Sequence, residues 1–324
     1  MLNFRTPIQL PAAPFRFGYE DEILTMGSCF AQRMGERLQA AKFRTHTNPL
    51  GIVYNPISMA RLLNMLREGG VIPEIRLSPH QLWHSFDLHS QFSHVDKQVL
   101  KQRIDEAFAR TGEALRRASL LMLTFGTAYV YVRRDRGEIV TNCHRYPADF
   151  FHKKLLHNSR IFRAFQPLFQ ALFEANPRLR VILTVSPVRH IKEGLPNNNL
   201  SKSVLRIACQ ELADAFGQVD YFPAFEVMMD DLRDYRFYQD DLIHPTPFAE
   251  TYIWELFTAH YLQPGSQQLL KRWGEIQQGL AHRPLRPGSP EHRKFLRSLL
   301  KKIQALPPQL DCRAELEALQ QQLG

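Results

Sequence analysis

Three short apolar segments, each followed directly by Gly or Ser, place the strongest constraint on how this chain can fold. They span residues 22–26, 120–125 and 180–185 and are bounded by polar residues, which is typical of buried strands. Residues at helical spacing separate them. Alternating strands and helices predict an α/β fold, in which helices cover both faces of a mostly parallel sheet. Ligands bind such sheets at the carboxyl ends of the strands, where these Gly and Ser residues fall.

The sequence changes character after residue 262. Before it, a β-hairpin is predicted over residues 129–142 and a helix over residues 150–175. From Gln263 onward the pattern is helical and interrupted by proline-rich stretches. This part of the sequence contains ten Lys and Arg residues but only five Asp and Glu residues. We therefore expect a main domain over residues 1–262 and a basic, helical C-terminal extension over residues 263–324.

Composition excludes several classes of protein. Hydrophobic residues make up 44% of the chain and charged residues 23%, as in ordinary globular proteins. No secretory signal and no membrane-length apolar stretch is visible, so a cytoplasmic location is expected. Basic helical surfaces are usually solvated, so we expect no nucleic-acid partner. The sequence carries no indication of oligomeric state.

Neither a metal nor a cofactor is expected. The four cysteines are scattered without a CxxC pair, which argues against a zinc site and a disulfide framework. His80, His84, His89 and His94 are irregularly spaced, with no obvious pair on one helical face, and Pro79 favours a loop there. Nothing resembles a glycine-rich nucleotide-binding loop.

Ser28 occupies the first strand end, between Gly27 and an amphipathic helix. One interpretation is structural, because Ser is a preferred N-cap residue. The other is catalytic, because a serine at a helix N-terminus lies among free backbone N–H groups that can stabilise an oxyanion. The side chain of Cys29 is expected to point away from a site that Ser28 faces.

The sequence Asp-Leu-Ile-His at residues 241–244 supplies a partner for Ser28. An acid three residues before a histidine can bond Nδ1 of the ring and leave Nε2 to act as a base. Asp241 has the right offset for His244, and Asp240 is the alternative. A plain surface loop is the competing interpretation.

Residues 27–31, Gly-Ser-Cys-Phe-Ala, match the signature of the GSCFA domain family. Further blocks that resemble this family lie at residues 48–56, 142–144, 185–190, 221–223 and 234–238. The family is similar to the SGNH/GDSL hydrolases. The resemblance implies a flavodoxin-like three-layer sandwich with a mostly parallel central sheet, with Ser28 as nucleophile, His244 as general base and Asp241 as its orienting acid.

The sequence departs from this pattern at the oxyanion hole, because the block that usually holds an Asn reads Gly-Thr-Ala-Tyr at residues 126–129. The candidate donors are the backbone N–H groups of Ser28 and Gly51, the hydroxyl of Thr127, and the amides of Asn142 and Asn48. The candidate substrate-binding histidines are His89, His144 and His190, and a structural hydrogen bond is the alternative role for each.

The sequence therefore predicts a serine-dependent esterase or deacylase. Its substrate would be a small-molecule or carbohydrate acyl ester, for example an O-acetylated sugar. Three alternatives remain open: an O-acyltransferase using the same site, a ligand-binding domain without catalysis, and an adaptor whose basic tail binds an anionic polymer.

Overall fold

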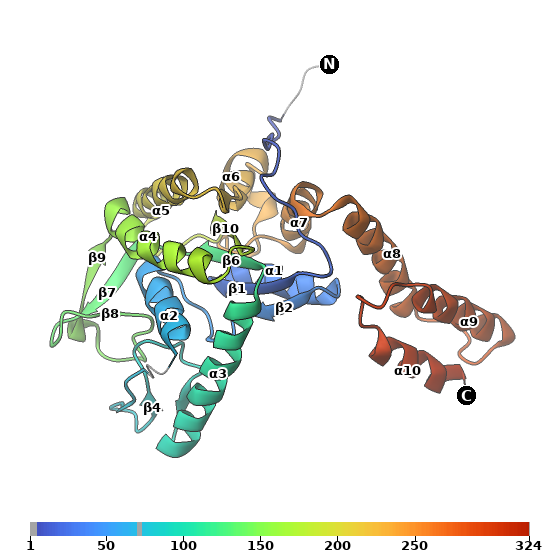
Figure 1. Ribbon diagram of the computed structural model, residues 1–324, viewed down its shortest axis with the longest axis horizontal. Helices are drawn as coiled ribbons and strands as arrows, with labels where there is room; N and C mark the ends of the chain where they lie inside the picture. The colour runs from blue at the N-terminus through green and yellow to red at the C-terminus, as the bar shows by residue number, and fades with distance from the viewer. Residues whose placement is uncertain (1–4, 70–72, 324) are drawn as a thin grey trace.

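A five-stranded parallel sheet forms the centre of the molecule. The computed structural model describes residues 5–69 and 73–323 (Figure 1). The strands follow the order β2-β1-β6-β10-β11, and all four neighbouring pairs are parallel. Their bounds are β1 Glu22–Gly27, β2 Arg44–Thr47, β6 Leu120–Phe125, β10 Arg180–Val185 and β11 Val219–Tyr221. The predicted α/β fold is confirmed, and this strand order is that of flavodoxin-like proteins.

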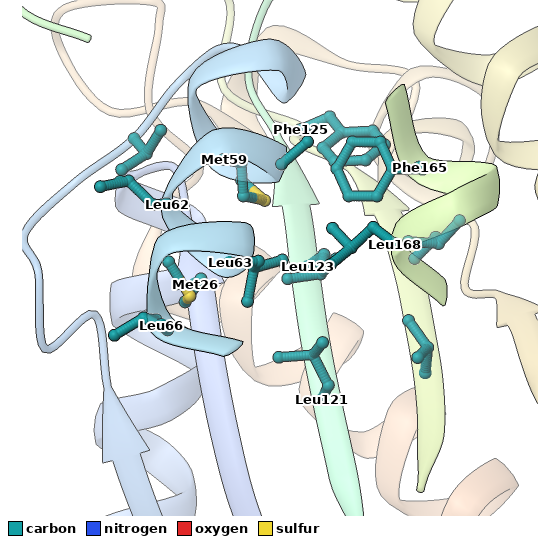
Figure 2. Close-up of a cluster of buried hydrophobic side chains, with 14 of the residues drawn as sticks. Met26, Met59, Leu62, Leu63, Leu66, Leu121, Leu123, Phe125, Phe165 and Leu168 are labelled. Carbon is teal, nitrogen blue, oxygen red and sulfur yellow. The ribbon is translucent and has the colours of Figure 1, made fainter. Parts of the chain in front are cut away.

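Side chains alternate between the two faces of the sheet and build a core on each. Leu121 and Leu123 pack with one set of helices, as Figure 2 shows for α2, whereas Leu120 and Met122 pack on the opposite face. The first set consists of α2 Pro56–Glu68, α3 Lys97–Arg117, α4 Asn158–Ala175 and α5 Leu195–Ala215. The second set includes α1 Cys29–Ala40 and α7 Pro247–Tyr261. The result is the expected three-layer sandwich.

Two small antiparallel sheets lie beside the main one. They are β3-β4-β5, with bounds Arg76–Leu77, Trp83–His84 and Ser93–His94, and β8-β7-β9, with bounds Ile139–Val140, Tyr129–Arg133 and Phe151–Leu155. The predicted hairpin is confirmed as β7 and β8. The helix predicted from residue 150 is wrong at its start, because residues 151–155 pair with β7 and α4 begins only at Asn158.

Short helical segments connect the last strand to α7. They are α6 Ala224–Glu226, a π-helical turn Val227–Asp231 and a 3₁₀ turn Tyr235–Phe237; a further 3₁₀ turn, Ala148–Phe150, precedes β9. The π turn keeps Val227 and Met228 buried against the α1 side of the sheet.

The C-terminal helices pack against the end of α1. Their bounds are α8 Pro264–Leu280, α9 Pro290–Gln304 and α10 Arg313–Leu323, and Figure 1 shows them grouped at one end of the molecule. The indole N–H of Trp273 donates to the carbonyl oxygen of Ala40 at 2.7 Å, and Lys42 pairs with Glu315 at 2.6 Å. None of the helices described is long and apolar enough to cross a membrane.

Candidate active site

The turn between β1 and α1 is fixed by contacts that only glycine permits. Gly27 has a φ of +144°, and a Cβ there would lie 2.3 Å from the carbonyl oxygen of Thr124. Its N–H donates to Asn48 Oδ1 at 2.8 Å, and the N–H of Ser28 donates to the Thr124 carbonyl at 3.1 Å. These bonds tie the turn to β6 and to the loop after β2, so the first residues of α1 are held at the carboxyl edge of the sheet.

Ser28 is the N-cap of α1. Its side chain is buried, with 1% of the residue exposed, and Oγ accepts the N–H of Phe30 at 3.2 Å. The structural interpretation of Ser28 therefore describes its position well. The hydrogen bonds among the described residues do not include one between Ser28 Oγ and His244.

Cys29, the first residue of α1, faces the histidine instead. Its Sγ lies 3.8 Å from His244 Nε2. The expectation that this side chain points away is wrong. Successive residues of a helix are rotated by about 100°, so when Ser28 folds back over the helix end, its neighbour projects on a different side. That side is the one from which the loop before α7 approaches.

Asp241 and His244 form the predicted pair. Asp241 Oδ2 is 2.6 Å from His244 Nδ1, while Oδ1 accepts the backbone N–H groups of Ile243 at 2.8 Å and His244 at 3.0 Å. These bonds, the one from His244 first, lower the pKa of Asp241 to about 2. The ionised carboxylate can only accept, so Nδ1 carries the proton and, in the neutral ring, Nε2 is left as an acceptor. Asp240 takes no part in these bonds.

Arg189 supports the loop that carries the pair. Its guanidinium lies 3.9 Å from the ring centroid of Tyr238, and its backbone N–H donates to the carbonyl of Ile243 at 3.3 Å. Leu242 adopts a φ of +57°, which closes the turn between Asp241 and His244. The loop is thus anchored to the segment that follows β10, on the same edge of the sheet as Cys29.

Lys202 is buried behind this edge and was not predicted. Its Nζ donates to the carbonyl oxygens of Gly126 and Ser186, each at 2.7 Å. These two residues directly follow β6 and β10. Burial lowers the pKa of Lys202 to about 7. Burial also raises the pKa of the Cys29 thiol, and the positive charge of Lys202 opposes that increase. The sequence carries no signal for this residue, because lysines are common on exposed helix surfaces and the two carbonyls that it binds come from other segments.

Most of the predicted oxyanion donors are engaged in other hydrogen bonds. The N–H of Ser28 is bonded as described above, and the N–H of Gly51 donates to the carbonyl of Asn48 at 2.7 Å. Thr127 Oγ1 lies 3.2 Å from Ser201 Oγ. Asn48 Nδ2 donates to Gln32 Oε1 at 3.2 Å, whereas the bond described for Asn142 is one that its Oδ1 accepts, from the N–H of His144 at 2.8 Å. The Cys29 N–H belongs to the first turn of α1, where N–H groups have no intrahelical acceptor.

The three predicted substrate-binding histidines occupy separate places. His144 is buried, with Nε2 2.7 Å from the carbonyl oxygen of Ser85, and burial lowers its pKa. His190 Nε2 is 3.2 Å from Ser201 Oγ, which joins it to the Thr127 network, and burial lowers its pKa to about 4. His89 packs against Gly51, where a Cβ would lie 2.4 Å from the Cβ of His89. The hydrogen bonds of His144 and His190 are made to other protein groups, as in the structural role that was the alternative for each.

Fold and site together define an α/β protein with a thiol, an imidazole and a carboxylate at the carboxyl edge of a parallel sheet. The family model described as "GSCFA family" matches residues 22–257, and the model described as "GSCFA domain protein, C-terminal domain" matches residues 273–324. The chain belongs to the GSCFA family.

Solved structures similar to this chain include several esterases. A carbohydrate esterase family 3 protein from Talaromyces cellulolyticus is 9% identical, with a TM-score of 0.34, covering 78% of this chain and 98% of that one. A family 3 carbohydrate esterase from Clostridium thermocellum is 12% identical, with a TM-score of 0.30 and coverages of 78% and 97%. The acetyl xylan esterase Est2A from Butyrivibrio proteoclasticus is 12% identical, with a TM-score of 0.37 and coverages of 74% and 63%. No curated protein matches the chain.

Proposed function

We propose that this protein is an acyl-ester hydrolase in which His244 is the general base and Asp241 orients it. One observation carries the proposal: Nδ1 of the ring is bonded to the carboxylate at 2.6 Å while Nε2 is directed at the first turn of α1. A base held by an acid and aimed at a nucleophile at a helix N-terminus is the arrangement required for acyl transfer.

The exposure of the pair favours water as the acyl acceptor. The side chains of Asp241 and His244 are each 44% exposed, so solvent reaches the base directly. An acyltransferase has to keep water away from its acyl intermediate, usually by closing the site. Hydrolysis is therefore the reaction we propose.

The substrate we propose is the acyl ester of a small molecule or a carbohydrate, with an O-acetylated sugar as the first case to test. Two exposed aromatic residues support this class. Tyr54 is 45% exposed, its ring lies against Gly126 at the end of β6, and the pKa of its hydroxyl is raised by burial and by the nearby Cys29. Tyr235, 58% exposed, belongs to the segment before the histidine loop. Aromatic side chains are common in ligand sites because one face contacts apolar groups.

The test is ester hydrolysis by the purified full-length protein, with 4-nitrophenyl acetate and acetylated xylo-oligosaccharides as substrates. His244→Ala should lower kcat/KM by about 100-fold or more, since general base catalysis contributes on this scale. His152→Ala, at an exposed position of β9, is the matched control and should keep the wild-type rate. If the wild type hydrolyses neither ester, or if His244→Ala is as active as the control, the proposed function is wrong.

A further inference from the structure

We infer that Cys29, and not Ser28, is the nucleophile, so that the acyl group is carried as a thioester. This inference rests on the proposed function. It concerns which of two adjacent residues forms the covalent intermediate, and the arrangement of both around His244 decides it.

Ser28 is committed to the helix. Its hydroxyl oxygen accepts the Phe30 N–H at 3.2 Å, and the residue is 1% exposed. To attack an ester, Oγ would have to give up this bond and turn out of its buried position. The N–H of Ser28 is also taken, by the carbonyl of Thr124.

Cys29 needs no such rearrangement. Its Sγ is already 3.8 Å from His244 Nε2, within hydrogen-bonding range for sulfur, and the residue is partly exposed. Because Asp241 holds the proton of the ring on Nδ1, the nitrogen that faces the thiol is the unprotonated one. The thiol therefore donates to the atom that would remove its proton.

Burial raises the pKa of the Cys29 thiol, so the resting group is neutral and requires a base. Two features then stabilise the thiolate once it forms. One is the N-terminus of α1, whose dipole favours negative charge. The other is Lys202, whose positive charge opposes the increase in the thiol pKa while this lysine is protonated. A neutral thiol beside a histidine fits general base catalysis.

The reaction balances with water as the only co-reactant. His244 Nε2 takes the thiol proton as Sγ bonds to the ester carbonyl carbon, and the Cys29 N–H is placed to donate to the developing oxyanion. The C–O bond then breaks, and the alcohol leaves with the proton from Nε2. Water attacks the thioester, giving its proton to Nε2; the acid departs and the proton returns to Sγ.

The first arm of the test locates the acyl group. The wild type is mixed with 4-nitrophenyl acetate, quenched in acid, digested and analysed by mass spectrometry. We expect one acetyl group on Cys29, removed by neutral hydroxylamine as thioesters are. Cys29→Ala should lose it, and Ser28→Asn, which keeps a good N-cap residue, should retain it. An acetyl group on Ser28 that persists in Cys29→Ala would overturn the inference and leave the proposed function standing.

The second arm works without any ester substrate. Iodoacetamide should alkylate Cys29 at pH 8 about tenfold or more faster than Cys143, the other partly exposed cysteine, whose pKa burial raises to about 11. His244→Ala should slow alkylation of Cys29 by about tenfold and leave Cys143 unchanged. If Cys29 is alkylated no faster than Cys143, and its alkylation rate is the same in His244→Ala, the inference fails, whatever esters the protein hydrolyses.

Discussion

Asp241 forms two hydrogen bonds with His244: Oδ2 lies 2.6 Å from Nδ1 of the ring, and Oδ1 accepts the backbone N–H of the histidine at 3.0 Å. The carboxylate thereby fixes both the position of the residue and the rotation of its imidazole. Because the two residues are only three positions apart, one loop carries both members of the pair.

Asp241→Asn should reduce kcat/KM for ester hydrolysis by about 100-fold or more. An amide has a single oxygen, so it cannot accept both the ring Nδ1–H and the backbone N–H groups that the two carboxylate oxygens now accept. The ring then loses both its tautomer preference and its charge partner. Steady-state kinetics of the full-length protein measure the effect. Asp240→Asn removes the same charge one residue earlier and should stay within about twofold of wild type; equal losses in both variants would contradict a specific role for Asp241.

The hydrolysis rate should fall as the pH is lowered from about 8 to about 5, because a protonated imidazole cannot accept a proton from the nucleophile. Asp241, with a pKa lowered to about 2, stays ionised throughout this range and adds no second step. The measurement is kcat/KM against pH at constant ionic strength. A flat profile, or an acid limb with two steps, would argue against a lone histidine base.

Lys202→Met should change how stability depends on pH. Burial lowers the lysine pKa from 10.5 to about 7, so between these values the unfolded chain binds a proton that the folded protein does not. The free energy of unfolding then rises with pH, by up to about 1.4 kcal/mol per pH unit from this group. Between pH 7 and pH 9.5, the free energy of unfolding in urea should increase more for the wild type than for Lys202→Met. A constant difference between the two proteins would mean that Lys202 titrates normally.

Asn48→Ala should destabilise the protein by about 1–3 kcal/mol, because the buried N–H of Gly27 loses its acceptor. Urea unfolding measures this loss, and a slower ester hydrolysis should accompany it as the β1–α1 turn loosens. The control is Asn64→Ala in α2, where the amide donates to the carbonyl of Ala60 and accepts from the exposed Arg67, and Ala is a better helix former. A similar loss in both variants would show that the Gly27 contact has no special weight.

The sheet and the Asp241–His244 pair were predictable from sequence because both depend on local patterns. Buried strands have short apolar runs, and an acid three residues before a histidine can bond it within one loop. The start of α4 was not predictable, since residues 151–155 become a strand only by pairing with β7, which is a tertiary contact.

Two features of the site could not be predicted from the sequence. Which of Ser28 and Cys29 faces the histidine depends on a rotation of about 100° between neighbours, and no periodicity sets its starting angle. Lys202 acquires its partners, the carbonyls of Gly126 and Ser186, only when β6 and β10 lie side by side.

The bond from Trp273 to Ala40 also bears on the site at the other end of α1. That helix has twelve residues, about 18 Å from end to end, with Cys29 at its beginning and Ala40 at its last position. The hydrogen bonds described here do not join the C-terminal helices to Asp241 or His244. They do hold the last residue of α1, the helix whose first residue carries the thiol. Without these helices α1 would keep its packing against the sheet but lose the hydrogen bonds from Trp273 and Gln277 to its last residue, at the end opposite the thiol.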